Sequence, residues 1–361
     1  MNILVAGGAG MIGSHLCEAL LLAGHQVVCL DNLSTGRFKN VEPLAKHPRF
    51  RFIRHDITLG LPELGPIDRF YHLASPASPI GYARLPIETM LANSEGTRRL
   101  LERTLALGAR FLYCSTSEIY GDPLEHPQRE TYRGNVSPTG PRSIYDEAKR
   151  YGEAMTMAFV RTFGVDGRIV RIFNTYGPRA DLQDGRVVVN FLTQALRGQP
   201  MTIYGDGLQT RSLCYVADLV DGLVRTMEAD QARGEVLNLG NPEEHTVMEI
   251  ATLIRDLTGS HSPFIFTPPA VGDDPRQRRP DIDKARRLLG WAPSMALDSG
   301  LRLMIQELRP EIIAELPARP GSPIATTNGT NGAHGPGTTP ASTHRRGTPV
   351  VRSRHEGSPP G

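Results

Sequence analysis

The sequence predicts an α/β fold in which helices cover both faces of a doubly wound parallel sheet. Short apolar runs alternate with longer segments whose apolar residues recur at helical spacing, which is the pattern of strands buried on both faces. A glycine-rich turn follows the first apolar run directly and leads into a helical pattern. The chain has 361 residues, and at roughly 150 residues per domain this length suffices for two domains.

The apolar runs and the helical patterns follow one another in a regular order. Strands are predicted at 3–6, 27–30, 50–53, 70–73, 111–114 and 167–173. Helices are predicted between them at 14–23, 87–107 and 143–163, and beyond Gly177 at 187–197, 215–227, 248–257 and 282–289. Gly108, directly after one of these patterns, is typical of a helix C-cap.

This order predicts three parts of the chain. Residues 1–177 form the sheet domain, and 178–315 mainly form a smaller lobe whose Pro- and Gly-rich connections suit a substrate-binding region. Residues 319–361 are rich in Gly, Pro, Ser and Thr and contain almost no large apolar side chains. Such a composition buries too little surface to offset the entropy of ordering, so we predict a disordered tail.

Composition and charge exclude several classes of protein. Hydrophobic residues make up 39% and charged residues 22% of the chain, and the formal net charge is +2, so a nucleic-acid-binding surface is not expected. The chain begins without a basic leader, and its apolar runs fall short of the roughly 18 residues that a membrane span needs. Its four cysteines are scattered without a CxxC pair, which favours a reducing cytoplasm and argues against a metal site.

The glycine-rich turn has the spacing of a dinucleotide-binding loop. Gly7, Gly10 and Gly13 lie between the first predicted strand and the first predicted helix, where backbone N–H groups can meet a pyrophosphate. Asp31 ends the second predicted strand, where its carboxylate can accept both hydroxyls of a ribose and repel a 2′-phosphate. These residues predict a Rossmann-like sheet that binds NAD rather than NADP, with Arg37 as the counter-argument. A glycine-rich turn without a ligand is the alternative.

A second group of residues predicts proton transfer. Tyr145 and Lys149 lie four residues apart on a predicted helix and therefore share one face. An ammonium next to a phenol favours the phenolate and makes it a better base. Thr116 follows the fifth predicted strand, where its hydroxyl can share a substrate proton with Tyr145. The three residues together predict an active site.

Several motifs resemble those of the extended short-chain dehydrogenase/reductases, and within them the UDP-glucuronate decarboxylases. The resemblance covers about residues 1–310 and depends most on the stretches LASPASP at 73–79, STSE at 115–118 and GPRSIYDEAKR at 140–150. RIFNTYGPR at 171–179 and GDGLQTR at 205–211 are shared more widely with nucleotide-sugar epimerases and dehydratases. The chain departs from the pattern at Leu91, where many relatives have a substrate-side lysine, and at Arg133, where tryptophan is common.

The resemblance implies roles for individual residues. The implied catalytic residues are Tyr145, Lys149, Thr116, Glu118 and Arg278. The implied NAD-binding residues are Gly7, Gly10, Met11, Ile12, Gly13, Asp31, Asn32, Ser34, Thr35, Gly36, Asp56, Ile57, Leu73, Ala74, Ser75, Tyr145, Lys149 and Thr175. The implied substrate-binding residues are Pro79, Tyr82, Glu118, Arg142, Asn174, Arg186, Tyr204, Gln209, Arg211 and Arg278.

The resemblance also implies the reaction. UDP-glucuronate is oxidised at C4, loses its C5 carboxylate as carbon dioxide and is reduced again to UDP-xylose, so that NAD is regenerated. Ser117 stands where sugar-nucleotide 4,6-dehydratases have an acid, which disfavours dehydration, and Glu118 stands where simple epimerases usually have none. A UDP-sugar 4-epimerase and a non-catalytic NAD-binding regulator remain the alternatives, and Glu118 could be an ordinary surface acid. The resemblance further implies a homodimer formed through the helices at 87–107 and 143–163.

Overall fold

A seven-stranded parallel sheet forms the centre of the computed structural model, which describes residues 1–268 and 277–314. The strands follow one another across the sheet in the order β11 (Val236–Leu239), β6 (Asp166–Ile172), β5 (Arg110–Thr116), β4 (Arg69–His72), β1 (Asn2–Ala6), β2 (Gln26–Asp31) and β3 (Phe50–Arg54). The order reverses at β1, with β2 and β3 on one side and β4 to β6 on the other. This is the doubly wound arrangement that the alternation of apolar runs predicted, and it places ligands at the carboxyl ends of the strands.

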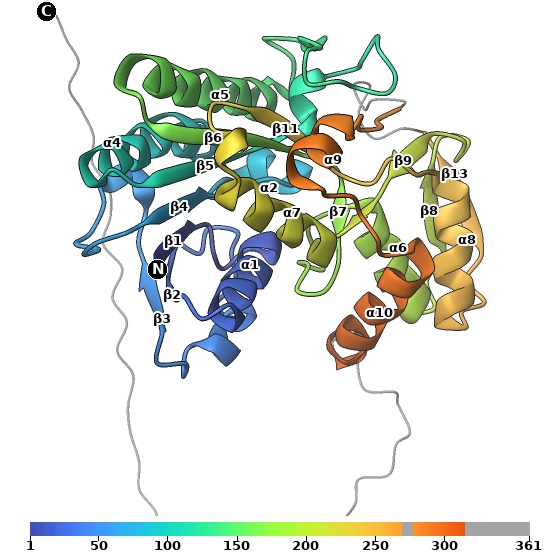
Figure 1. Cartoon of the computed structure of the whole chain (residues 1–361). Helices are drawn as coiled ribbons and strands as arrows, with labels where there is room; N and C mark the ends of the chain where they lie inside the picture. The colour runs from blue at the N-terminus through green and yellow to red at the C-terminus, as the bar shows by residue number, and fades with distance from the viewer. Residues whose placement is uncertain (269–276, 315–361) are drawn as a thin grey trace, which may run out of the picture. The chain divides into compact units, whose positions relative to one another are not determined.

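Helices cover both faces of the sheet (Figure 1). The helices α1 (Met11–Leu22) and α7 (Val216–Glu228) lie on one face, and α4 (Thr97–Leu107) and α5 (Ser143–Phe163) lie on the other. Along β1, Ile3 and Val5 pack in one core cluster with Leu16 of α1, whereas Leu4 packs in a second cluster with Leu100 of α4. All five side chains are fully buried, so the alternation of side chains along a strand divides the core into two layers.

The remaining elements surround the carboxyl ends of the strands and build a smaller region beside them (Figure 1). Its helices are α6 (Val187–Leu196), α8 (Val247–Thr258) and α10 (Leu297–Ala314). Its short strands pair as β8 (Met201–Tyr204) with β13 (Phe264–Thr267), β9 (Thr210–Ser212) with β12 (Glu244–Thr246), and β7 (Thr175–Tyr176) with β10 (Cys214–Tyr215). The chain therefore leaves the sheet after β6, builds part of this region, and returns through α7 and β11 before α9 (Asp283–Leu289).

Most predicted elements are confirmed, and two differences have a physical cause. Each predicted strand is present with its ends shifted by no more than two residues, and Gly108 caps α4 in the left-handed conformation. The helix predicted over 87–107 is present without a break, but a π-helical turn at Ala92–Gly96, which the sequence pattern did not indicate, divides it into α3 (Pro86–Leu91) and α4. β11 was missed because its four residues are too few to show a period.

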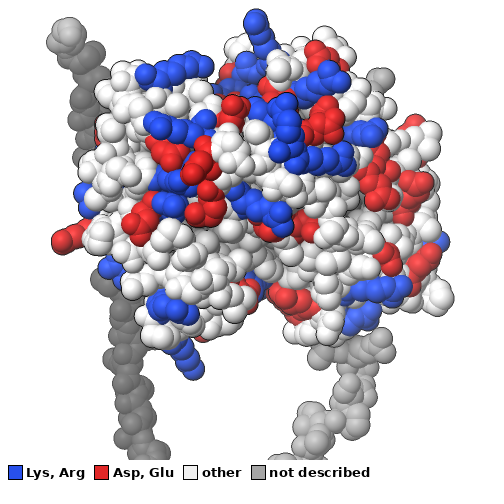
Figure 2. Space-filling model, in the orientation of Figure 1, with Lys and Arg blue, Asp and Glu red and all other residues white. Residues whose placement is uncertain are grey.

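Four further points concern what the sequence led us to expect. All four cysteines are buried and carry free thiols. Within the ranges that the structure covers, no helix is long and apolar enough to cross a membrane. The face in Figure 2 shows acidic and basic side chains interspersed rather than gathered into a field of one sign. The predicted disordered tail at 319–361 lies outside the described residues.

Candidate active site

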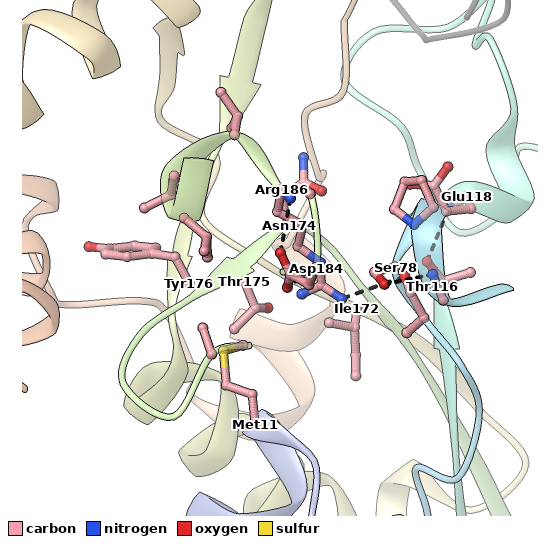
Figure 3. Close-up of a pocket in the computed structure, with 18 of the residues that line it drawn as sticks. Met11, Ser78, Thr116, Glu118, Ile172, Asn174, Thr175, Tyr176, Asp184 and Arg186 are labelled. Carbon is pink, nitrogen blue, oxygen red and sulfur yellow. Dashed lines mark hydrogen bonds and ion pairs between the residues drawn. The ribbon is translucent and has the colours of Figure 1, made fainter. Parts of the chain in front are cut away.

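A cavity of about 1270 Å³ opens at the carboxyl ends of β1, β5 and β6. One wall comes from the sheet and α5, and the opposite wall comes from α6, β8 and β9. Figure 3 shows Thr116 and Glu118 together on one side of this cavity, Asp184 and Arg186 on another, and Met11 at its base. All five predicted catalytic residues line it, namely Thr116, Glu118, Tyr145, Lys149 and Arg278.

The glycine-rich turn forms the base of this cavity, and its shape depends on having no side chains. Gly7 has φ +81°, and a Cβ there would lie 2.6 Å from the backbone N of Ala74. A Cβ on Gly13 would lie 2.2 Å from the carbonyl oxygen of Gly7. The turn is therefore packed tightly against its neighbours while the N-terminus of α1, with Met11 and Ile12, faces the cavity. Unpaired N–H groups at such a helix end bind phosphate oxygens.

A second cavity of about 110 Å³ continues from the first beside Asp31. It is lined by the predicted adenosine-side residues Asp31, Asn32, Ser34, Gly36, Asp56, Ile57 and Ala74, and it shares Gly7, Gly10, Thr35, Leu73 and Ser75 with the larger cavity. Leu91 also lines the smaller cavity, so this departure from the family pattern lies on the adenosine side rather than on the substrate side. The two cavities together fit a dinucleotide laid across the glycine-rich turn.

Asp31 and Arg37 decide which dinucleotide fits. The Asp31 carboxylate accepts backbone N–H groups from Ala9 at 2.9 Å and from Leu33 at 2.8 Å, which fixes it at the mouth of the smaller cavity. Arg37 points away from that cavity, because its guanidinium donates to the carbonyl oxygens of Arg179 and Ala180 at 3.0 and 2.7 Å. The counter-argument from Arg37 therefore loses its force, and the site suits NAD.

Tyr145, Lys149 and Thr116 meet at the junction of β5 and α5. Lys149 is buried and donates from Nζ to the carbonyl oxygen of Cys114 at 2.9 Å. Its Nζ lies 5.8 Å from the ring centroid of Tyr145 and 5.2 Å from that of Tyr113. A hydrogen bond from Thr116 to Tyr145 is one of the influences that lower the pKa of Tyr145. The helix α5 thus brings the phenol and the ammonium to one face, as their spacing predicted, and β5 adds the Thr116 hydroxyl.

The pKa values of this group differ from those of free side chains. Burial raises the pKa of Tyr145 above its usual 10, the charge of Glu118 adds to the rise, and Thr116 and Arg186 oppose it. Burial lowers the pKa of Lys149 to about 8. Lys149 is therefore still mostly cationic at neutral pH. The side chains of the protein alone do not make Tyr145 a strong base, although the sequence led us to expect that Lys149 would favour its phenolate.

Glu118 lies between two arginines rather than at the surface. It forms ion pairs with Arg142 and with Arg278, and their side chains are all mostly buried. Burial alone would raise the pKa of Glu118, but the charges of Arg278 and Arg142 outweigh it and lower the pKa to about 2. Arg278 also has two buried guanidinium nitrogens, Nε and Nη2, without a hydrogen-bond partner among the described atoms. The cluster carries one net positive charge and suits an anionic ligand group.

The other predicted substrate residues surround the rest of the cavity, with one exception. Pro79, Arg142, Asn174, Arg186, Tyr204, Gln209 and Arg211 line it, as does Thr175 from the predicted NAD-binding set. Tyr82 of α2 (Pro79–Arg84) is not among the lining residues. It is 5% exposed and its ring stacks on that of Tyr145, with centroids 5.2 Å apart and an angle of 11° between the planes. Tyr82 thus contacts the candidate base.

Sequence reasoning missed Asn93, which accepts a hydrogen bond from Tyr113, the residue whose ring lies next to the Lys149 ammonium. Asn93 is fully buried, donates to the Ser75 hydroxyl at 2.8 Å and accepts from the Tyr113 hydroxyl at 2.9 Å. Its position on the π-helical turn brings it between the two. A polar residue within an apolar helical pattern was the only signal, and it does not reveal these distant partners. His72, by contrast, is fully buried and hydrogen-bonded to Thr97, as a packed core residue.

Asp146, next to Tyr145, was also missed. It is 4% exposed, and its Oδ1 has no hydrogen-bond partner among the described atoms. Burial, and then the charge of Glu118, raise the pKa of Asp146 to about 7. This carboxyl group therefore changes its charge close to neutral pH beside the candidate base.

The raised pKa of Asp146 predicts a pH-dependent stability. Below about pH 4 this carboxyl group is protonated in the folded and unfolded chains alike, and between pH 4 and 7 the unfolded chain ionises first, so folding loses stability. Asp146→Asn does not titrate. We expect its free energy of unfolding, relative to that of the parent protein, to rise by ~2–4 kcal/mol between pH 4 and pH 8 in urea titrations. The exposed Asp256→Asn should show no such trend, and equal trends for both variants would contradict the assignment.

A metal centre is not supported by the side chains in view. Among the described residues, no group of three or more His, Cys, Asp or Glu side chains is arranged to hold a metal ion.

Comparisons with known proteins agree with this geometry. Residues 3–240 match the model of the NAD dependent epimerase/dehydratase family. The chain is 50% identical to UDP-glucuronic acid decarboxylase 1 of Arabidopsis thaliana over 315 residues, covering 87% of this chain and 71% of that protein. It is also 50% identical to UDP-glucuronic acid decarboxylase 1 of Danio rerio over 311 residues, covering 86% of this chain and 73% of that protein.

The chain also resembles a protein that was solved with ligands bound. The UDP-glucuronic acid 4-epimerase of Bacillus cereus, in complex with UDP-glucuronic acid and NAD, matches with a TM-score of 0.78 at 32% identity. The match covers 86% of this chain and 100% of the epimerase. The chain therefore belongs to the NAD dependent epimerase/dehydratase family, and within it to the UDP-glucuronic acid decarboxylases.

Proposed function

We propose that the protein converts UDP-glucuronate to UDP-xylose and carbon dioxide with bound NAD. The observation that carries this proposal is Glu118 clamped between Arg142 and Arg278 in the cavity that also holds Tyr145, Lys149 and Thr116. A cationic cluster beside a candidate base fits a sugar that carries a carboxylate. The 50% identity to UDP-glucuronic acid decarboxylases supports the same substrate.

In this proposal the two connected cavities would hold NAD. Asp31 holds the adenosine ribose, the N-terminus of α1 meets the pyrophosphate, and Thr175 lies near the reactive end. When bound, NAD supplies the acceptor for the C4 hydride, the hydride for the final reduction, and a positive charge near the base. That charge acts against the raised pKa of Tyr145.

The residues of the chain move the proton and hold the carboxylate. The phenol oxygen of Tyr145, in its ionised form, accepts the proton of the C4 hydroxyl, and Thr116 hydrogen-bonds the same oxygen. Loss of the C4 hydride makes a ketone that is β to the carboxylate. The electrons of the bond between C5 and the carboxylate then move onto the ketone oxygen, where Tyr145 and Thr116 stabilise the enolate as carbon dioxide leaves. A proton from solvent adds at C5, and when the sugar is reduced at C4, Tyr145 returns its proton to the C4 oxygen.

The arginines explain why loss of the carboxylate is favoured over simple epimerisation. Arg278 offers buried nitrogens without partners, and Arg142 lies on the other side of Glu118. Guanidinium groups hold a carboxylate by paired hydrogen bonds in a fixed plane. When the carboxylate is fixed, the bond between C5 and the carboxylate can be held in the orientation in which its electrons move into the ketone. An epimerase instead needs the sugar ring to rotate between two hydride transfers.

A direct assay tests the proposal. Purified protein with NAD is incubated with UDP-glucuronate, and carbon dioxide and the nucleotide sugar are followed by mass spectrometry. Carbon dioxide together with UDP-xylose is the expected result. UDP-galacturonate without carbon dioxide would establish the 4-epimerase instead, and binding of NAD without turnover of any UDP-sugar would indicate a regulator.

We also propose a homodimer formed through α3, α4 and α5, in the cytoplasm. Ile87 and Met90 on α3 and Tyr151 on α5 are exposed, and these two helices pack together, so they present apolar surface side by side. Four buried free thiols suit a reducing compartment. Light scattering at micromolar concentration measures the mass of the protein in solution, and the mass of a monomer would contradict the dimer. Cell fractionation tests the cytoplasmic location.

A further inference from the structure

Arg278, which holds the substrate carboxylate in the proposed function, lies on an irregular stretch of backbone. It is 6% exposed and pairs with Glu118, yet it precedes α9 and belongs to no helix or strand. A side chain that must meet a substrate carboxylate needs a backbone that holds its Cα in place, because a misplacement of about 1 Å can cost about 100-fold in rate. The contacts of the residues directly after Arg278 therefore help to hold its backbone in place.

Gln128 makes these contacts through both its backbone and its side chain. Its N–H donates to the Arg279 carbonyl oxygen at 2.9 Å, and its own carbonyl oxygen accepts the N–H of Asp281 at 2.9 Å. Its side-chain Oε1 accepts the N–H of Arg279 at 2.8 Å, and its Nε2 donates to the Glu125 carbonyl oxygen at 2.7 Å. Gln128 is fully buried. Both polar groups of the Arg279 backbone are thus bound to this one residue.

Asn238, in the edge strand β11, connects Gln128 and Asp281 to the segment that contains Glu118. Its Nδ2 donates to the carbonyl oxygens of Gln128 at 3.0 Å and of Asp281 at 3.1 Å. Its Oδ1 accepts the Tyr120 hydroxyl at 2.8 Å, and Tyr120 follows Glu118 by two residues. Both partners of the ion pair between Glu118 and Arg278 are therefore tied to one buried network.

We propose that Gln128 is a positioning residue that holds Arg278 in register with Glu118 and thereby tunes binding of the substrate carboxylate. This inference rests on the proposed function. Gln128 does not line the cavity, so it acts through Arg278 rather than on the substrate itself. A purely structural role would affect every ligand of the cavity equally, whereas a role in placing Arg278 affects only ligands with a carboxylate.

The test compares two ligands that differ at that group. Dissociation constants of UDP-glucuronate and UDP-glucose are measured by calorimetry for Gln128→Met, in a Tyr145→Phe background that prevents turnover. Methionine keeps the length of the side chain and removes both the acceptor for the Arg279 N–H and the donor to the Glu125 carbonyl oxygen. We expect UDP-glucuronate to bind about tenfold more weakly, the size of one charge-assisted contact, while UDP-glucose changes by less than about twofold.

A matched control removes a similar hydrogen bond elsewhere. Gln231 donates from Nε2 to the Leu288 carbonyl oxygen at 2.6 Å and does not line the cavity. Gln231→Met should leave both dissociation constants unchanged. In the background with Tyr145 intact, Gln128→Met should also lower kcat for carbon dioxide release by about tenfold, while Gln231→Met does not.

The outcomes separate this inference from the proposed function. Equal weakening of both ligands in Gln128→Met, or no change in either, would overturn the positioning role. Absence of carbon dioxide release by the parent protein would instead overturn the proposed function, while the two dissociation constants would still report on Gln128.

A second variant covers the case in which Gln128→Met does not fold. Arg129 is exposed and pairs from Nε with Asp281 Oδ2 at 3.2 Å, so Arg129→Met loosens the same segment without touching the core. A selective weakening of UDP-glucuronate by about two- to fivefold is expected for this variant. Unselective weakening, or none, would count against the inference.

Discussion

Tyr145→Phe should lower kcat for carbon dioxide release by about 10²- to 10⁴-fold while leaving the dissociation constants of NAD and UDP-glucuronate nearly unchanged. The variant removes only the hydroxyl whose oxygen, in the proposed mechanism, accepts the C4 proton. Its ring still fits against Tyr82, whose plane lies within 11° of that of Tyr145, and the packing of α5 is kept. Single-turnover measurements of carbon dioxide and of absorbance near 340 nm show which step is lost. Both should disappear together, because proton removal accompanies C4 oxidation.

Tyr151→Phe is the matched control, since Tyr151 is on the same helix but is 49% exposed. It should retain the activity of the parent protein. A Tyr145→Phe variant that released carbon dioxide at an undiminished rate would remove Tyr145 from the role of base. If the variant formed the 340 nm absorbance but no carbon dioxide, Tyr145 would instead act after oxidation.

The pH dependence of this step follows from the same residues. Glu118 has a pKa of about 2, so it stays anionic throughout the range in which the protein is studied and produces no acid limb. Lys149 has a pKa of about 8 and loses its charge above that pH. Because the raised pKa of Tyr145 and the lowered pKa of Lys149 belong to neighbouring groups, a measured rate profile reports the pair rather than either residue.

Features that depend on residues close together in the sequence could be predicted. The glycines from Gly7 to Gly13 lie between one strand and the next helix along the chain. Their spacing in the sequence was therefore enough to locate the turn. Tyr145 and Lys149 share a helix face because they lie four residues apart. Glu118 and Thr116 end the same strand region, and the carboxyl end of a parallel strand is where a ligand lies.

Features that depend on distant residues could not be predicted. Gln128 is 110 residues from Asn238 and 151 from Arg279, and nothing in the local sequence indicates that these groups share hydrogen bonds. The pKa of Asp146 depends on Glu118, which a loop and the start of α5 bring close to it. The stacking of Tyr82 on Tyr145 joins α2 to α5, two helices that are far apart in the sequence. The sequence therefore indicated which residues line the site, but it did not indicate the distant residues that set their positions and pKa values.

Gly10→Ala should fold like the parent protein but lose about 10- to 100-fold in affinity for NAD. Gly10 has φ −71° and ψ 172°, which alanine adopts without strain, and its added Cβ would meet only the Gly7 carbonyl oxygen at an ordinary 3.4 Å. The residue lines both cavities, and in the proposed binding mode the pyrophosphate comes close to its backbone. A methyl group there occupies space that belongs to the ligand rather than to the protein.

Gly13→Ala makes the comparison informative, because its Cβ would lie 2.2 Å from the Gly7 carbonyl oxygen and 2.8 Å from the Gly8 Cα. Neither backbone atom can move away without opening the turn, so this variant should lose ~3 kcal/mol or more of folding stability. Thermal unfolding without added NAD and calorimetric titration with NAD measure the two effects separately. Gly10→Ala should change only the second measurement and Gly13→Ala both. If Gly10→Ala bound NAD as tightly as the parent protein, the pyrophosphate would not lie against this turn, and the assignment of the two cavities to one dinucleotide would fail.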